Sequence, residues 1–455
     1  MPTSKYLDAV ECSDQPLDFA FHPKRDNILA VGLVDGSLEV HDIRRETNDD
    51  DDEPDSILSS LSLHTQQISQ KGSDKKKHAS CRAVEFSLDG ERLYTGGSAG
   101  DLCCVDAERV STFSTKPQKS LTWRIDEATE GNMNPLLVIH PFHTSASLLA
   151  TGDDVGGVRV WDERIREGAT AAPSYASSKQ NRPQGCVLSW KENEDYISDM
   201  ELSEDGNTLL ASCADGRLSV FDLRMARDAS AINQGKKPYR LSDDQEDELL
   251  SLKIIKNGKK VVCGTQEGVL SIFSWGRWGD CSDRFPGHPS SIDALLKVDE
   301  DTLLTASSDG LIRVVQIHPD KLLGVIGKDH GGFPVEKLGF NANRELVGSV
   351  AHDNHVHLWD ARVLQEASDE DSDEDDAPEE EDEDLNQAAK PKASVRTAAA
   401  QNSDDDWDGM DDKADAEDSE DDSEEDDSDD EEAATLNDKR KKRLKTATEK
   451  FFDDL

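Results

Sequence analysis

The chain has 455 residues and a formal net charge of −46 at pH 7, and its length predicts several domains or one large repetitive domain. Eight cysteines without a C-x-x-C pair, and the absence of any run of about 18 apolar residues, argue against a disulfide scaffold and a membrane span. The acid excess gives no reason to expect long-range attraction to nucleic acid, although a local contact with RNA stays open.

A unit of one kind recurs seven times after an apolar N-terminal stretch, KYLDAVEC at residues 5–12. Each unit has a tight turn rich in Gly, Asp or Asn, followed by a period-2 run of Val, Leu and Ile that predicts a strand. The turn residues are Gly36, Gly100, Gly156, Gly216, Gly268, Gly310 and Asn354.

Most of these turns are preceded by two further apolar runs, such as residues 17–23 and 27–34 in the first unit. The order strand, turn, strand, tight turn, strand predicts antiparallel blades and excludes an alternating βα plan. The turn residues lie 42 to 64 residues apart, against about 40 to 45 for a propeller blade of the WD type. The longer spacings hold charged insertions such as residues 48–55 and 74–77, which we expect to be surface loops.

Dipeptides of the WD type end several of these strands and resemble those of WD-repeat β-propellers, over roughly residues 5–365. Trp161-Asp162 and Trp359-Asp360 carry the clearest resemblance. The resemblance implies a polar tetrad of His, Ser or Thr, Asp and Trp in each blade, but the other units have no Trp at that position. We therefore expect incomplete tetrads and more stabilisation by hydrophobic packing between blades. The substitutes at the Trp position are His41, Val105, Phe221, Phe273 and Val315.

The seventh blade needs a fourth strand that the acidic sequence after residue 367 cannot supply. Residues 5–12 precede the first complete blade, so we predict that they pair beside blade seven and close the ring. The expected fold is all-β: a seven-bladed WD-repeat β-propeller over residues 1–366 with a disordered acidic C-terminal tail.

Motifs for chemistry do not appear: there is no P-loop, no G-x-G-x-x-G opening a helix, no H-E-x-x-H and no G-x-S-x-G. We expect no enzyme activity, no cofactor and no metal site. His352, His355 and His357 are the best metal candidate, but two of them flank a turn and need not converge. Cys103 and Cys104 point to opposite faces of one strand, so we expect one of them to pack in the core.

An Arg recurs two places after the WD-type Asp, as in WDER and WDAR. The pattern resembles the W-D-x-R box with which some propellers dock on the adaptor of cullin-4 ubiquitin ligases, and Arg164 or Arg362 would make that contact. The alternative is that each Arg pairs with a neighbouring acid on the rim of its blade.

The segment of residues 367–436 is strongly acidic: from residue 369 to 436 it holds 33 Asp or Glu against four Lys or Arg. Such a segment cannot build a core, and it would attract basic proteins such as histones or ribosomal proteins. Six serines have an acid three residues later, a context that acid-directed kinases select, although a merely solvating spacer is the alternative. These are Ser368, Ser372, Ser403, Ser419, Ser423 and Ser428.

The last segment, residues 437–455, reverses the charge with the run KRKKRLK. We interpret the run as a nuclear or nucleolar localisation signal, with an RNA-contacting patch or a charged helix face as alternatives. Apolar residues at spacings of three and four also predict a short amphipathic helix here. The basic residues of the signal are Lys439, Arg440, Lys441, Lys442, Arg443 and Lys445.

The whole arrangement resembles the WD repeat-containing protein 55 family, with its fungal Jip-type members. The features that carry this resemblance are seven degenerate repeats, a first blade reading DQPLDFAFHPKRDNILAVGLVDGSLEVHDI, and an acidic tail that ends in a basic run. The resemblance implies a non-catalytic nucleolar scaffold that supports ribosome biogenesis or rRNA production.

The expected partners are pre-ribosomal assembly factors or basic ribosomal proteins, with a monomeric propeller inside a larger assembly and no membrane contact. Two alternatives remain: a substrate receptor of a cullin-4 ubiquitin ligase, and a histone-binding chaperone that uses the acidic tail.

Overall fold

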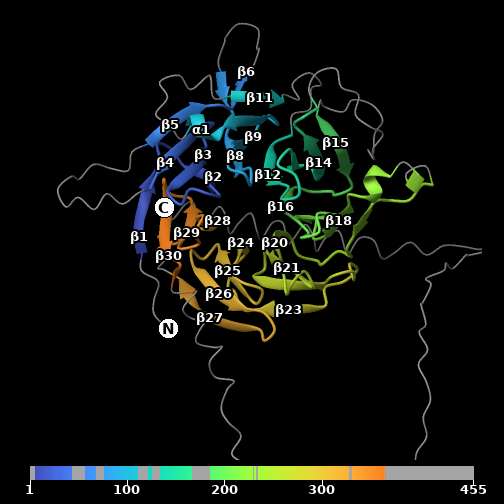
Figure 1. The fold of residues 1–455 in the computed structure, drawn as a ribbon. Helices are drawn as coiled ribbons and strands as arrows, with labels where there is room; N and C mark the ends of the chain where they lie inside the picture. The colour runs from blue at the N-terminus through green and yellow to red at the C-terminus, as the bar shows by residue number, and fades with distance from the viewer. Residues whose placement is uncertain are drawn as a thin grey trace, which may run out of the picture. The chain divides into compact units, whose positions relative to one another are not determined.

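Seven four-stranded sheets form a closed ring, the seven-bladed β-propeller predicted from the repeats (Figure 1). The computed structural model describes residues 6–43, 57–67, 76–110, 121–125, 134–165, 185–228, 230–231, 234–326, 330–362 and 364. Within these residues, no helix is long and apolar enough to cross a membrane.

Blades I, II and III each take four strands in chain order from the centre outward. Blade I has β2 (Pro16–Phe21), β3 (Ile28–Leu33), β4 (Ser37–Asp42) and β5 (Ile57–Ser62). Blade II has β8 (Cys81–Phe86), β9 (Arg92–Gly97), β10 (Leu102–Asp106) and β11 (Leu121–Ile125). Blade III has β12 (Leu136–Pro141), β13 (Leu148–Asp153), β14 (Gly157–Asp162) and β15 (Cys186–Lys191).

Blades IV, V and VI repeat the same order. Blade IV has β16 (Ile197–Leu202), β17 (Thr208–Cys213), β18 (Leu218–Asp222) and β19 (Tyr239–Leu241). Blade V has β20 (Leu249–Ile255), β21 (Lys260–Thr265), β22 (Val269–Ser274) and β23 (Asp283–Pro286). Blade VI has β24 (Ile292–Lys297), β25 (Thr302–Ser307), β26 (Ile312–Gln316) and β27 (Lys321–Ile326).

Blade VII joins the two ends of the ring. It has β28 (Val335–Phe340), β29 (Leu346–Ala351) and β30 (His355–Asp360), and its outer strand is β1 (Tyr6–Glu11). β1 runs antiparallel to β30, with Val10 opposite Val356, and the two strands lie side by side in blue and orange in Figure 1. This is the pairing expected for residues 5–12, and it leaves no blade of the ring short of a strand.

The tight turns between the second and third strands explain why glycine recurs there. Six of the seven turn residues are glycines in the left-handed region, with φ between 79° and 85°, where a Cβ would be strained. At Gly36 a Cβ would also lie only 2.4 Å from the carbonyl oxygen of His64. Asn354 replaces glycine in the seventh turn, where the Cys12 N–H, just after β1, donates to the Asn354 carbonyl oxygen over 2.9 Å.

Smaller elements lie in the connections. The short helix α1 (Ala107–Val110) follows β10, and the 3₁₀ helix η3 (Met225–Arg227) follows β18. β6 (Thr65–Gln67) and β7 (Lys76–His78) pair between blades I and II. Part of the insertion at 74–77, expected as a loop, therefore belongs to a strand, because cross-strand pairing with β6 supplies its backbone hydrogen bonds.

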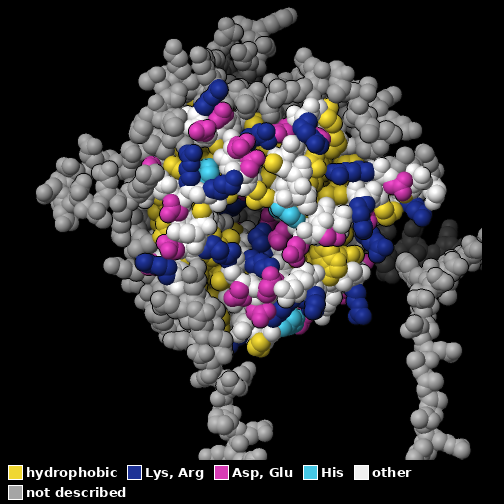
Figure 2. All heavy atoms as spheres, in the orientation of Figure 1, with side chains coloured by type: hydrophobic (Ala, Val, Ile, Leu, Met, Phe, Trp, Pro, Cys, Tyr) yellow, Lys and Arg dark blue, Asp and Glu magenta, His cyan; other side chains and the backbone are white. Residues whose placement is uncertain are grey.

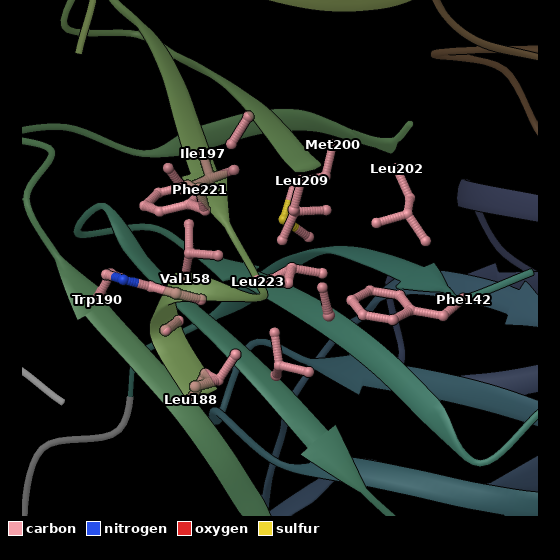
Figure 3. Close-up of a cluster of buried hydrophobic side chains, with 14 of the residues drawn as sticks. Phe142, Val158, Leu188, Trp190, Ile197, Met200, Leu202, Leu209, Phe221 and Leu223 are labelled. Atoms are coloured by element: carbon pink, nitrogen blue, oxygen red, sulfur yellow. The ribbon is translucent and has the colours of Figure 1, made fainter. Parts of the chain in front are cut away.

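Each blade is covered on both faces by its neighbours, so the hydrophobic core lies between blades. The cluster between blades III and IV is shown in Figure 3, where Trp190 and Phe221 lie close together, with ring centroids 4.6 Å apart. Cys103 and Cys104 are both fully buried, which corrects the expectation that only one would pack in the core. The reason is that a strand between two blades has no solvent-facing side.

Candidate functional site

The first strands of all seven blades surround the centre of the ring (Figure 1). All seven have the same irregularity in register between their first and third residues, so their positions are equivalent from blade to blade. The third and fifth positions carry most of the charge. We call the charged and histidine residues there the central charge cluster: Asp18, Glu85, His140, Asp199, Glu201, Lys253 and Lys337.

Members of the central charge cluster bind the backbone of the next blade. In the described sheets the inner edge of each first strand has no partner strand, so its N–H groups need other acceptors. The Val84 N–H donates to Asp18 Oδ2 over 2.8 Å, and the Leu252 N–H donates to Asp199 Oδ2 over 3.2 Å. These side chains therefore hold adjacent blades together at the centre.

His140 acts in the same way from blade III. The Leu202 N–H of blade IV donates to His140 Nε2 over 3.2 Å, which requires that this nitrogen carry no proton. Burial, with a smaller contribution from Lys253, lowers the pKa of His140 to about 4. His140 is therefore neutral at physiological pH and serves as an acceptor.

Two lysines neutralise part of the negative charge. Lys337 Nζ of blade VII lies 3.0 Å from Asp18 Oδ1 of blade I, so this ion pair spans the junction where the ring closes. Lys253 Nζ lies 3.1 Å from Asp199 Oδ2 and 3.5 Å from Glu201 Oε2. Burial alone would lower the pKa of Lys253, but the two carboxylates outweigh it and the pKa is raised.

Glu85 is the member of the cluster with the least compensation. Burial raises its pKa to about 7, while Lys337 opposes the shift and Asp18 adds to it. Four carboxylates face two ammonium groups in the cluster, so full ionisation leaves two negative charges in excess. Figure 2 shows side chains of both signs and a histidine gathered over the centre of the visible face.

The arginines of the W-D-x-R boxes lie at the ends of the third strands of blades III and VII. Arg164 Nη2 is 2.7 Å from Asp162 Oδ2, and Arg362 Nε donates to Asp360 Oδ1 over 2.9 Å. The hydrogen bonds from each Arg hold the pKa of its Asp below the usual range. Both arginines pair with a neighbouring Asp, which is one of the two alternatives expected from the sequence. The side chains of Arg164 and Arg362 are nevertheless 66% and 60% exposed.

The WD-type tetrads are partial. In blade VII the Trp359 Nε1–H donates to Ser349 Oγ over 2.7 Å, and Ser349 Oγ lies 2.9 Å from His330 Nε2. Among the described residues of blade III, the tetrad retains only the bond from the Trp161 Nε1–H to Thr151 Oγ1, 2.8 Å long. Where the sequence has other residues at the Trp position, the side chains His41, Val105, Phe221, Phe273 and Val315 are all fully buried.

His64 is a tetrad residue that the sequence reasoning missed. Its Nδ1 lies 2.8 Å from Asp101 Oδ2 and its Nε2 lies 3.0 Å from Thr95 Oγ1. Gly287 directly precedes His288, but Leu63 precedes His64, so only the position of His64 ahead of blade II signals this role.

Of the three histidines weighed as metal ligands, His352 and His357 bind different carboxylates, and the ring centroid of His355 lies 6.0 Å from that of His357. His352 Nε2 lies 2.6 Å from Glu336 Oε1, and His357 Nε2 lies 2.7 Å from Asp353 Oδ2. The described residues place other potential ligand atoms within 4.8 Å of one another, and the most buried such groups are Cys12 with Glu39 and His41, and His64 with Asp101 and Cys103. Sequence spacing could not indicate these groups, because each joins two separate segments.

The acidic segment 367–436 and the basic segment 437–455 lie outside the described residues. This also applies to the six serines and to the localisation signal at 439–445. Their roles stay predictions from the sequence.

Comparison with known proteins gives a consistent result. The WDR55 family model matches residues 7–364, which is the whole propeller. The WD repeat-containing protein JIP5 of Malassezia globosa is 36% identical over 375 residues, 79% of this chain and 82% of that protein. The WD repeat-containing protein 55 of Arabidopsis thaliana is 34% identical over 353 residues, 77% and 82% of the two chains. The WD repeat-containing protein 55 of Rattus norvegicus is 33% identical over 346 residues, which cover 76% of this chain and 74% of that protein.

Proposed function

Because the chain belongs to the WD repeat-containing protein 55 family, we propose that it is a non-catalytic nucleolar scaffold that supports ribosome biogenesis or rRNA production. Protein contacts on the propeller carry this function. The observation on which the proposal depends most is the family match over residues 7–364, since a WD-repeat propeller implies protein interactions in general.

The partners we propose are pre-ribosomal assembly factors or basic ribosomal proteins. Two features of charge support this: the excess of acid in residues 367–436, and the two negative charges in excess in the central charge cluster. Nuclear and nucleolar localisation would follow from the basic run at 439–445.

Affinity purification of the full chain from cells, followed by mass spectrometry, tests the function. We expect pre-ribosomal factors with the full chain, and a loss of the basic proteins when residues 368–436 are deleted. Capture of histones in place of pre-ribosomal factors would support the chaperone alternative instead. The absence of pre-ribosomal factors from both samples would contradict the proposal.

Localisation is tested separately with a fluorescent fusion. Replacing the six basic residues of 439–445 by Gln should move the protein out of the nucleolus. The matched control replaces the four basic residues of the acidic segment, Lys390, Lys392, Arg396 and Lys413, and should leave it there. Equal distributions of the two variants would exclude the run as the signal.

The exposure of Arg164 and Arg362 supports a second candidate, docking on the adaptor of a cullin-4 ubiquitin ligase. Each guanidinium is oriented by its own Asp and remains exposed to a partner. A pull-down with the adaptor should lose binding in the Arg164→Ala and Arg362→Ala variants. Arg224→Ala is the control, because Arg224 has the same spacing from Asp222 but contacts it at 3.8 Å. Equal capture by all three variants would exclude these boxes.

A further inference from the structure

The fifth residues of the first strands of blades II, III and IV are all potential hydrogen-bond acceptors. In two of these blades this side chain accepts a backbone hydrogen bond from the next blade, and blade II is the exception. His140 of blade III accepts the Leu202 N–H of blade IV, and Glu201 of blade IV accepts the Ile254 N–H of blade V. In both cases the donor is the sixth residue of the next first strand. The fifth-position side chain of these two blades thereby receives one hydrogen bond from the neighbouring blade.

Glu85 of blade II holds the same position but lacks the donor. The sixth residue of the next first strand is Pro141, which has no N–H. The carboxylate of Glu85 accepts a hydrogen bond from the N–H of Phe86 in its own strand. No ion pair to Glu85 occurs among the described residues, and the ammonium of Lys337, the cation that lowers its pKa most, lies against Asp18.

We propose that Glu85 is a binding site for a lysine or arginine side chain of a basic partner protein at the centre of the propeller. Three features carry the inference: a half-buried carboxylate, the missing N–H at Pro141, and the excess of two negative charges in the central charge cluster. An ammonium or guanidinium group supplies the donors that Pro141 cannot, and a charge-assisted hydrogen bond in a partly desolvated site is strong.

This inference rests on the proposed function for the nature of the partner, since basic proteins are the partners proposed there. It adds the residue that receives them. It also distinguishes binding at the propeller from binding at the acidic segment. The acidic segment would attract the same proteins through its many carboxylates, without a fixed geometry.

Site-resolved cross-linking of the full chain tests the proposal. The probe is a ten-residue peptide of alternating Gly and Lys, coupled with a water-soluble carbodiimide. The reagent activates a carboxylate, the lysine amine displaces it to form an amide, and the reagent leaves as its urea. Trypsin then releases residues 83–92, which contain Glu85, Asp89 and Glu91 in one peptide.

The comparison inside this tryptic peptide provides the control. Glu91 is exposed, whereas Glu85 is half-buried, so simple access favours Glu91. We expect the peptide amide mainly on Glu85. An amide on Glu91 at an equal or higher yield would overturn the proposal.

Variants link the site to the partners. Glu85→Gln removes the charge and keeps the shape, and Glu91→Gln, at the exposed carboxylate just before β9, is the matched control. We expect Glu85→Gln to lower capture of basic proteins from cells at least threefold and Glu91→Gln to leave it unchanged. If Glu85→Gln retains every partner of the unaltered chain, this inference fails while the proposed function stands. If the unaltered chain captures no pre-ribosomal factor, the proposed function itself fails.

Discussion

Replacing Glu85 by Gln should stabilise the propeller, and the gain should depend on pH. The folded chain raises the pKa of Glu85 from 4.5 to about 7, mainly by burial. Well below pH 4.5 the carboxyl is neutral in both states, so the substitution changes little. As pH rises toward 7 the unfolded chain loses its proton first, and ionisation increasingly favours unfolding.

The size of the effect follows from that shift. A difference of about 2.5 pKa units corresponds to about 3 kcal/mol, and solvent around a half-buried carboxylate reduces it to about 1–2 kcal/mol. The Glu85→Gln variant should therefore exceed the unaltered chain by this amount in free energy of unfolding at pH 8, and by well under 1 kcal/mol at pH 5.

Urea denaturation followed by tryptophan fluorescence at pH 5 and pH 8 measures both differences. Glu91→Gln is the control, because Glu91 is exposed and near in sequence. An equal gain at both pH values, or a loss of stability at pH 8, would refute the assignment of Glu85 as an uncompensated carboxylate.

Further predictions concern the closure, a tetrad and the rim. Val10 of β1 is 1% exposed, so Val10→Asp should lower the free energy of unfolding by about 3 kcal/mol in urea denaturation. Deleting residues 1–12 should lower the melting temperature of the whole domain. An unchanged unfolding transition in either variant would contradict closure by β1. Trp359→Phe removes the hydrogen bond to Ser349 and should cost about 1–2 kcal/mol by the same denaturation assay. Arg164→Ala and Arg362→Ala should lower the melting temperature only slightly in thermal unfolding, since the guanidinium of each pair is mostly exposed although its Asp is not.

The repeat architecture could be predicted because its signals are local. A turn that needs φ near 80° selects Gly at positions such as Gly156, and the runs after it have period 2. The role of residues 5–12 followed by elimination, since the acidic sequence after β30 could not form a strand. The insertions were harder, because a short pairing such as β6 with β7 leaves little pattern.

The central charge cluster could not be predicted in the same way. Alternating charges in a strand such as β16, ISDMEL, look like a solvent-facing side, although in a blade that side meets the next blade. Asp18 and Lys337 are more than 300 residues apart and meet only because the ring closes. Their pairing depends on the three-dimensional closure and has no counterpart in the local pattern.

Closure by β1 also sets an order of events during synthesis. β1 leaves the ribosome roughly 340 residues before β30, its only partner strand in the described sheets. At about 5–20 residues per second the strand waits on the order of 20–70 s with an unpaired edge, which is a template for wrong pairing. The nascent chain therefore passes through an obligatory interval as an open arc of blades, and a factor that covers β1 during that interval would govern how much of the protein reaches the closed ring.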